Sequence, residues 1–323
     1  MINKVNSVAK QVDWMRFLRT YGTLIAGGLI LIVFSILSPN SFASTDNFIN
    51  ISRQISFLVI IAIGATLVMS VGEFDLSVGA MASFGGVFSA QLAVQGYPIM
   101  IAFIIPLIVA FIIGYFNGWI VTKFRVLSFI TTLAMGTILG GINFRMTSGA
   151  TVFENIPTAF RYLGQTMWLN IPALSFIMLL LTFIFWYILT HTTFGRKLYA
   201  IGGNESASRV AGVNVKGNKN MAFALCSVLA ALTGILLASR LGSAHPTGGE
   251  GLFLPAYAAA FLGMTSFKDG IPNIWGTFVG AAIIGILANG LTILQVPTFL
   301  QDVITGCIVI LAVLVQKMGR EAS

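Results

Sequence analysis

Apolar runs about as long as a bilayer-spanning helix recur along this chain of 323 residues. A helix needs about 20 mostly apolar residues to cross the hydrocarbon core of a membrane. The sequence predicts ten such spans, of which the eighth is short: 21–38, 55–71, 77–95, 98–122, 127–146, 171–190, 221–239, 252–265, 274–294 and 299–315. We therefore expect an all-α, polytopic membrane protein that forms a single transmembrane domain over residues 1–323.

The composition excludes several other classes. Only 9% of the residues are charged and 57% are hydrophobic, with a mean hydropathy of +0.92, whereas a soluble domain carries about 25% charged residues. A soluble chain of this composition would expose a large apolar patch and aggregate, and a disordered chain needs lower hydrophobicity. The two cysteines, Cys226 and Cys307, lie in apolar runs, which excludes a disulfide scaffold.

The basic residues predict the orientation. If the N-terminus is cytoplasmic and ten spans alternate, fourteen of the 18 basic residues fall inside and four outside, in agreement with the positive-inside rule. The inner set is Lys4, Lys10, Arg16, Arg19, Lys123, Arg125, Arg196, Lys197, Arg209, Lys216, Lys219, Lys268, Lys317 and Arg320; the outer set is Arg53, Arg145, Arg161 and Arg240. We expect both termini in the cytoplasm, residues 1–20 as a cytoplasmic segment, and no nucleic-acid partner, because these bases form no stripe.

The first apolar run is expected to remain as a helix. The run from 22 to 37 is long for a signal peptide, and Ser38-Pro39-Asn40 after it is not a small-x-small cleavage site.

Two similar segments suggest an internal repeat. Gly114 and Asn117-Gly118 precede the turn at 126–129, and Gly285 and Asn289-Gly290 precede the turn at 296–299. Since each half holds five spans, related halves have to be inverted with respect to the membrane. A chance match of two glycine-rich turns is the alternative.

No catalytic constellation is present in the sequence. His191 and His245 fall on opposite sides of the membrane in this topology, and no glycine-rich loop ends in Gly-Lys-Ser/Thr. We therefore predict no catalytic residue, no metal site and no cofactor. Polar residues at membrane depth become the informative ones, because each is costly there.

The segment 72–79 joins the second and third spans and carries two acids, Glu73 and Asp75, between glycines. Ser77 is placed to cap the helix that follows. A helix break lined by acids is able to bind hydroxyl groups or a cation, so these three residues are candidates for a substrate pathway. A solvated turn at the membrane edge is the alternative.

Three asparagines within or beside the spans are further pathway candidates: Asn117, Asn143 and Asn289. An amide both donates and accepts hydrogen bonds and therefore suits a sugar hydroxyl. Hydrogen bonds between helices are the alternative role. The short eighth span with Pro255, and the stretch 266–272 after it, also favour a translocation pathway.

The longest polar stretch is a predicted cytoplasmic loop at 191–219, which holds five of the fourteen inner bases. Asn204 is suited to cap a short helix, Glu205 to its first turn, and Gly212 to its C-terminal end. Arg209, four residues after Glu205, is able to pair with it. The sequence predicts a helix at 205–211 that lies along the membrane surface and docks a cytoplasmic partner; a passive connector is the alternative.

Several of these segments, in this order, resemble the permease subunit of bacterial monosaccharide ABC importers, the ribose, xylose, galactose and autoinducer-2 group. The matching motifs are Leu37-Ser38-Pro39-Asn40-Ser41-Phe42, Phe74-Asp75-Leu76-Ser77-Val78-Gly79, the run from Thr192 to Glu205, the run from Ala207 to Val215, and Asn289-Gly290-Leu291. The resemblance covers nearly the whole chain. Glu73-Phe74 and the stretch Phe253-Leu254-Pro255-Ala256-Tyr257 depart from the family pattern, which leaves the sugar open.

The resemblance implies a set of partners in the bacterial inner membrane. Two permease subunits, identical or merely similar, would form the pathway within the lipid, and a periplasmic or lipid-anchored sugar-binding protein would deliver the substrate. Two ATPase domains would hydrolyse ATP and dock on the loop, through Asn204, Glu205, Ala207, Arg209, Gly212 and Asn214. The chain itself would not be an enzyme.

Two rival functions follow from the residues alone. An ion-coupled secondary sugar transporter would work without an ATPase and use Glu73 or Asp75, but it would have no reason to present a docking helix at 205–211. A membrane-embedded enzyme would need paired catalytic groups, which the sequence lacks.

Overall fold

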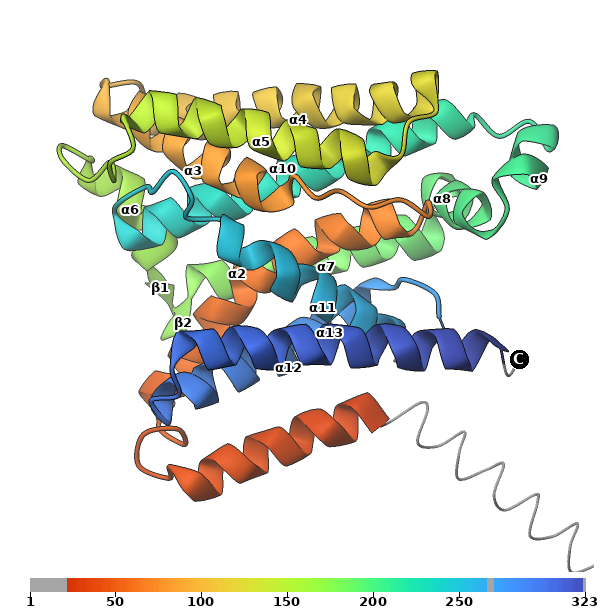
Figure 1. Ribbon diagram of the computed structural model, residues 1–323. Helices are drawn as coiled ribbons and strands as arrows, with labels where there is room; N and C mark the ends of the chain where they lie inside the picture. Colours follow the sequence, from red (N-terminus) through yellow and green to blue (C-terminus); the bar gives the residue numbers. More distant parts are fainter. Residues whose placement is uncertain (1–21, 266–269, 322–323) are drawn as a thin grey trace, which may run out of the picture.

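The computed structural model describes residues 22–265 and 270–321, with side chains of the last helix described as far as Leu314. The predicted cytoplasmic segment 1–20 and the residues 266–269 lie outside this part of the chain. The described chain is mostly helical, and most helices run side by side along one direction (Figure 1). The two strands, β1 (Met167–Trp168) and β2 (Ile171–Pro172), form one short antiparallel hairpin. The predicted all-α class is confirmed.

Each of the ten predicted spans is helical. The first helix is Gly22–Leu37. The others are α2 (Thr45–Met69), α3 (Val78–Val94), α4 (Ile99–Phe124), α5 (Ser128–Thr147), α7 (Ala173–His191), α10 (Val215–Leu241), α11 (Phe253–Met264), α12 (Ile274–Ile293) and α13 (Thr298–Glu321). Shorter helices complete the chain: α6 (Thr158–Gln165), α8 (Thr193–Gly203), α9 (Glu205–Val210) and the 3₁₀ turn η1 (Glu250–Leu252).

Two helices begin earlier than the hydropathy predicts, because polar caps start them outside the apolar run. The Ser44 hydroxyl accepts a hydrogen bond from the Asn47 amide, so α2 begins ten residues before the predicted span. The Asn214 side chain accepts one from the Gly217 amide and starts α10 at Val215. Side-chain caps satisfy first-turn N–H groups that have no partner within the helix.

Five of the described helices are long and apolar enough to cross a membrane: α2, α4, α7, α10 and α12. Shorter apolar helices are Gly22–Leu37, Val78–Val94, Glu250–Met264 and Thr298–Leu314. These helices are those of a multi-pass membrane protein.

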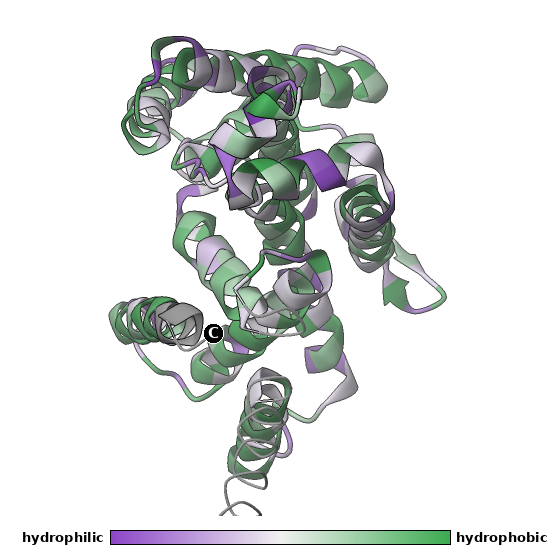
Figure 2. Cartoon of the chain, turned by 90° about the vertical axis from the view of Figure 1, so that its right-hand side faces the viewer, coloured by the Kyte–Doolittle hydropathy of each residue, from purple (hydrophilic) through white to green (hydrophobic). Residues whose placement is uncertain are grey.

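The core is formed by α2 and α10, whose most apolar windows are 83% and 72% buried. Helix α3 packs closely against α10: a Cβ added at Gly234 would lie 1.7 Å from the Ala82 carbonyl oxygen. By contrast, only 22% of the corresponding window of α4 is buried. Apolar side chains therefore cover the outside of the helices as well as the core, and hydrophobic colour dominates the ribbons in Figure 2. Such a surface suits contact with lipid.

The two ends of the helical bundle differ. One end, on the right of Figure 1, holds α8, α9, the α2–α3 connection and the α4–α5 connection. The opposite end holds α6 and the β1–β2 hairpin. The first end carries the candidate docking segment and is the place to look for the functional site.

Candidate functional site

Helix α9 forms as its sequence predicts. The Asn204 side chain accepts a hydrogen bond from the Ala207 amide at 2.9 Å, and Glu205 pairs with Arg209 at 2.6 Å. Gly212, with φ of +80°, follows the end of the helix. The helix ends at Val210, one residue before the predicted end.

The two faces of α9 are unlike. The Ser208 side chain is buried against the protein, whereas Val210 is 91% exposed. Ala207 is exposed as well. Sequence reasoning missed Val210, although a single valine on a short polar helix is an available signal. Because exposure of an aliphatic side chain to water is unfavourable, a Val at this tip suits burial against a partner.

A buried lysine ties α9 to the body of the protein. The Lys219 ammonium, on the first turns of α10, lies 2.6 Å from Glu73 Oε1 and 2.8 Å from Glu205 Oε2. Only 8% of the Lys219 side chain is exposed. The hydrogen bond from Lys219 holds the pKa of Glu205 below its usual value. The sequence shows no sign of this cluster, because Glu73 lies 146 residues from Lys219.

The α2–α3 connection, residues 70–77, is a helix break built around Asp75. Asp75 Oδ1 accepts hydrogen bonds from the Ser77 amide at 2.9 Å and the Ser77 hydroxyl at 2.5 Å. The Tyr257 hydroxyl bonds the backbone N–H and C=O of Asp75. Ser77 occupies the N-cap position of α3, as predicted, but its side chain makes no capping hydrogen bond, because its hydroxyl donates to the Asp75 carboxylate.

The two acids of the break differ in how deeply they are buried. Asp75 and Ser77 are 0% exposed, and Asp75 Oδ2 is buried with no hydrogen-bond partner among the described residues. Glu73 instead borders a cavity of about 620 Å³. Of these three pathway candidates, the one that borders open space is thus Glu73, whose carboxylate is already paired with Lys219.

The cavity next to the break lies between the break, α8 and the C-terminal part of α11. Phe74, Tyr199, Gly202, Phe261 and Met264 are among its lining residues. The Phe74 ring centroid lies 5.8 Å from that of Tyr257 and 6.1 Å from that of Phe261. Aromatic side chains and one carboxylate give the cavity a mixed apolar and polar wall, which suits the faces and hydroxyls of a small polar molecule.

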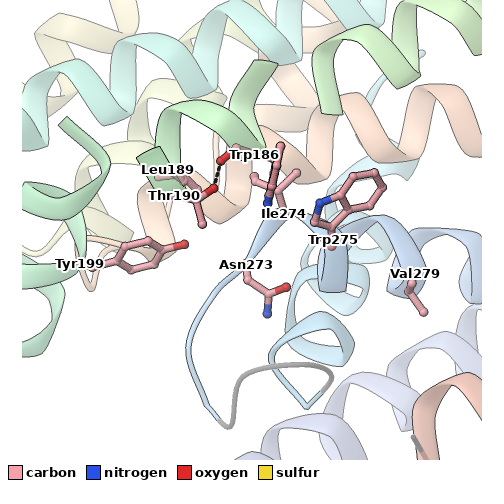
Figure 3. Close-up of a pocket in the computed structure, with 8 residues that line it drawn as sticks. All are labelled: Trp186, Leu189, Thr190, Tyr199, Asn273, Ile274, Trp275 and Val279. Atoms are coloured by element: carbon pink, nitrogen blue, oxygen red, sulfur yellow. Dashed lines mark hydrogen bonds between the residues drawn. The ribbon is translucent and has the colours of Figure 1, made fainter. Parts of the chain in front are cut away.

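A second cavity, of about 280 Å³, shares Tyr199 with the first and lies between α7, α8 and the start of α12 (Figure 3). The Tyr199 hydroxyl donates to the Pro272 carbonyl at 2.9 Å, and burial raises its pKa to about 12. The Trp186 and Trp275 rings lie 6.2 Å apart on the opposite side of the cavity. Among the described residues, no charged side chain lines this cavity, so it is less suited to a polar cargo than the larger one.

The structure does not bring the three candidate asparagines together. Asn289 and Asn47 exchange two amide hydrogen bonds of 3.0 Å between α12 and α2. Asn143 Nδ2 donates to the carbonyl oxygens of Ala80 and Pro246. Asn117 is 0% exposed, and neither polar atom of its side chain has a partner among the described residues. Asn289 and Asn143 therefore act as links between helices.

Among the described residues, no group of three or more His, Cys, Asp or Glu side chains is placed to hold a metal ion. The site is instead a capped surface helix, a buried ion-pair cluster and a helix break beside a cavity.

Comparison with known proteins shows the family to which this chain is related. Residues 47–313 match the family described as branched-chain amino acid transport system / permease component. The ribose import permease protein RbsC of Escherichia coli (strain K12) is 39% identical over 298 residues, which are 91% of this chain and 92% of that protein. RbsC of Bacillus subtilis (strain 168) is 37% identical over 310 residues, 95% of this chain and 96% of that one.

A third relative, the D-allose transport system permease protein AlsC of Escherichia coli (strain K12), is 33% identical over 313 residues. The match covers 97% of this chain and 96% of AlsC. No solved structure matches the chain. The chain therefore belongs to the family of transport-system permease components described above, and it is a transport subunit rather than an enzyme.

Proposed function

We propose that this chain is the transmembrane permease subunit of an ABC importer that carries a monosaccharide across the bacterial cytoplasmic membrane. The support is its identity of 33–39%, over most of its length, with permeases named for ribose and D-allose. In this proposal a partner ATPase hydrolyses ATP, a sugar-binding protein delivers the substrate, and two permease subunits, identical or merely similar, enclose the pathway.

Helix α9 is the proposed docking element for the ATPase. The exposure of Val210 carries this assignment, because it presents an apolar side chain outward while the opposite face of the same helix is tied to the protein. The residues proposed from the sequence have different roles in this docking element. They are Asn204, Glu205, Ala207, Arg209, Gly212 and Asn214. Asn204, Glu205 and Gly212 shape the helix, Asn214 caps α10, and Ala207 and Arg209 flank Val210 on the exposed surface.

The proposed topology has ten spans, with α9 and both termini in the cytoplasm. The structure supports it by gathering Lys123, Arg125, Arg196, Lys197 and Lys216 at the α8–α9 end, while Arg53, Arg145, Arg161 and Arg240 lie toward the opposite end. This separation agrees with the positive-inside rule.

The packing between helices supports two inverted halves. If α2, α3, α4 and α5 correspond to α10, α11, α12 and α13, then equivalent pairs should be in contact. They are: α4 packs on α10 as α12 packs on α2, and α3 packs on α5 as α11 packs on α13. The repeated glycines show the same correspondence between the halves. Gly114 of α4 contacts α10 at Phe223, and Gly285 of α12 contacts α2 at Ile55.

Docking on α9 is tested by co-purification of the ATPase with the permease in detergent. Val210→Asp is expected to lower ATPase recovery by about tenfold, since a charge cannot be buried in an apolar contact without loss. Leu169→Asp is the matched control, because Leu169 is 90% exposed but lies beside the hairpin at the opposite end. Equal recovery with both variants would show that α9 is not the docking element.

The cargo is tested in proteoliposomes that contain the permease, the ATPase and candidate binding proteins. Labelled D-ribose, D-allose and D-xylose are offered with and without ATP inside the vesicles. ATP-dependent uptake of one sugar is expected, and uptake driven by an ion gradient without ATP would instead favour a secondary transporter.

The orientation is tested by labelling a single cysteine. Ser206 is exposed on α9, and Cys307 is the exposed native cysteine that has to be replaced first. In a Cys307→Ser background, Ser206→Cys should react with a membrane-impermeant maleimide only after the cells are opened. Reaction in intact cells would overturn the proposed orientation.

A further inference from the structure

We infer that Lys219 is a positioning residue that transmits the displacement of α9 to the α2–α3 break and so to the cavity beside Phe74. The inference rests on the proposed function, since it takes α9 as the element that the ATPase moves. It adds the route by which that movement enters the transmembrane part of the subunit.

The first link of the route is a shared ammonium group. One nitrogen binds Glu205 of α9 and Glu73 of the break at 2.8 and 2.6 Å. The Lys219 side chain is 8% exposed, so water screens these contacts poorly. Removal of the ammonium would leave two carboxylates facing each other, and these repel. The distance between α9 and the break is therefore set by Lys219.

The neighbouring charges do not replace this link. Arg125, Arg209, Lys216 and Lys219 line one cavity of about 310 Å³ together with both acids. Arg209 binds the other oxygen of Glu205, Oε1, with its guanidinium group, and its side chain is 52% exposed. Among the ion pairs of the described residues, those of Lys219 are the ones that join α9 to the break.

The second link is a backbone contact between α8 and the same break. A Cβ added at Gly202 would lie 2.3 Å from the Ser70 carbonyl oxygen. Gly202 thus packs directly on the end of α2, and the absence of a side chain makes this close approach possible. Helix α8 thus contacts Ser70 directly, whereas α9 is linked to Glu73 through the Lys219 ammonium of α10. These two links lie on either side of Gly72, which has a φ of +78°.

The moving part is the short segment that carries Phe74. It follows Glu73 directly, and its ring lies against Tyr257 and Phe261 of α11 while bordering the cavity of about 620 Å³. A pull on Glu73 through Lys219 shifts Phe74 relative to α11, and the cavity offers the free volume for that shift. The cavity wall, including Met264, then changes its accessibility.

The experiment uses a cysteine reporter and needs no knowledge of the sugar. Met264→Cys is placed on the cavity wall in the Cys307→Ser background, and the permease–ATPase complex is reconstituted in nanodiscs. The rate of maleimide labelling is measured with and without MgATP and vanadate, which arrest the ATPase. With Lys219 in place, we expect nucleotide to change the labelling rate by about threefold or more.

Two substitutions interrupt the link from opposite ends. Lys219→Met and Glu73→Gln are each expected to abolish the nucleotide effect on labelling while the ATPase still co-purifies. Lys219→Arg should restore most of the effect, because it keeps the charge. Lys216→Met is the control: it removes a lysine from the same cavity and the same turn of α10, and it should behave like the parent. The double variant Lys219→Met/Glu73→Gln should be no worse than either single one.

Several results would overturn the inference. They are a parent that shows no nucleotide effect, a full effect in Lys219→Met or Glu73→Gln, or additive losses in the double variant. If Lys219→Met fails to insert, Glu73→Gln decides, because it leaves Lys219 paired with Glu205. Failure of the docking proposal is distinguished by the separate co-purification test, in which Val210→Asp would then bind the ATPase normally.

Discussion

The Lys219 ammonium lies 2.6 Å from the Glu73 carboxylate, and 146 residues of sequence separate the two. The same ammonium contacts Glu205 on α9, so one buried charge joins a surface helix to a helix break. A buried cation is stable only when it is paired in this way. The arrangement explains how a lysine is accommodated at an 8% exposed position. The other local features of the site make separate predictions.

The first prediction concerns the end of α9. Gly212 has a φ of +80° and no heavy atom within 4 Å of a Cβ added there, so a side chain at this position meets strain rather than a clash. Gly212→Val should cost about 1–2 kcal/mol locally and lower both ATPase recovery and ATP-driven transport, while membrane insertion stays normal. Gly203→Val is the control, because Gly203 has equally open surroundings without a positive φ. Equal behaviour of the two variants would contradict the prediction.

The second prediction concerns the start of α3. Asp75→Ala removes the oxygen that holds the Ser77 amide and hydroxyl, and loss of a comparable helix cap costs about 0.5–2 kcal/mol. Asp75→Asn keeps an oxygen acceptor and should retain most of that stability. Thermal unfolding in detergent compares the two variants. We expect transport to fall more than stability in Asp75→Ala, because the same break borders the cavity. Normal transport by this variant in liposomes would exclude that role.

The third prediction concerns the contact between α3 and α10. A Cβ added at Gly234 would lie 1.7 Å from the Ala82 carbonyl oxygen, which is backbone and cannot give way easily. Gly234→Ala should therefore destabilise the protein by about 1–3 kcal/mol or more, as overpacking does. Gly140→Ala in α5 makes the same change where nothing lies within 4 Å, and it should be neutral or slightly stabilising. The yield of folded protein and its melting temperature measure both.

The fourth prediction concerns pH. The pKa of Glu205 is lowered from its usual 4.5, first by the hydrogen bond from Lys219 and further by Arg209. A carboxyl with a lowered folded pKa stabilises the folded state fully above its ordinary pKa, and this contribution disappears as the pH falls through the folded value. The attachment of α9 should therefore be constant from pH 8 to 5 and weaken below pH 4.5.

A spin label at Ser206→Cys, in the Cys307→Ser background, reports this attachment through its mobility. The charged groups that face Glu205 are Lys219 and Arg209, with Glu73, Arg125 and Lys216 in the same cavity. Glu205→Gln should remove the transition at low pH. A rise in mobility between pH 7 and 6 in the parent would point to a different titrating group.

Much of the architecture follows from local sequence. All ten predicted apolar segments are helical, and the cap at Asn204, the pair Glu205–Arg209 and the positive φ of Gly212 are found where they were predicted. These features depend on residues within one or two turns of each other. Apolar runs, caps and glycines at helix ends act over that range, so the sequence alone carries the information.

Tertiary structure decided the roles of the polar residues at membrane depth. Ser77 lies at the predicted N-cap position, but its hydroxyl binds the Asp75 carboxylate rather than the helix. The sequence left Asn289 open to a pathway role or to a link between helices, and its hydrogen bonds with Asn47 make it a link. The sequence predicts Lys219 only as one of the inner basic residues and gives Val210 no role, whereas the structure makes Lys219 the centre of an ion-pair cluster and exposes Val210. A polar side chain in a membrane protein acts through whichever partner lies nearest in space, and the packing of distant helices, rather than the order of the chain, determines that partner.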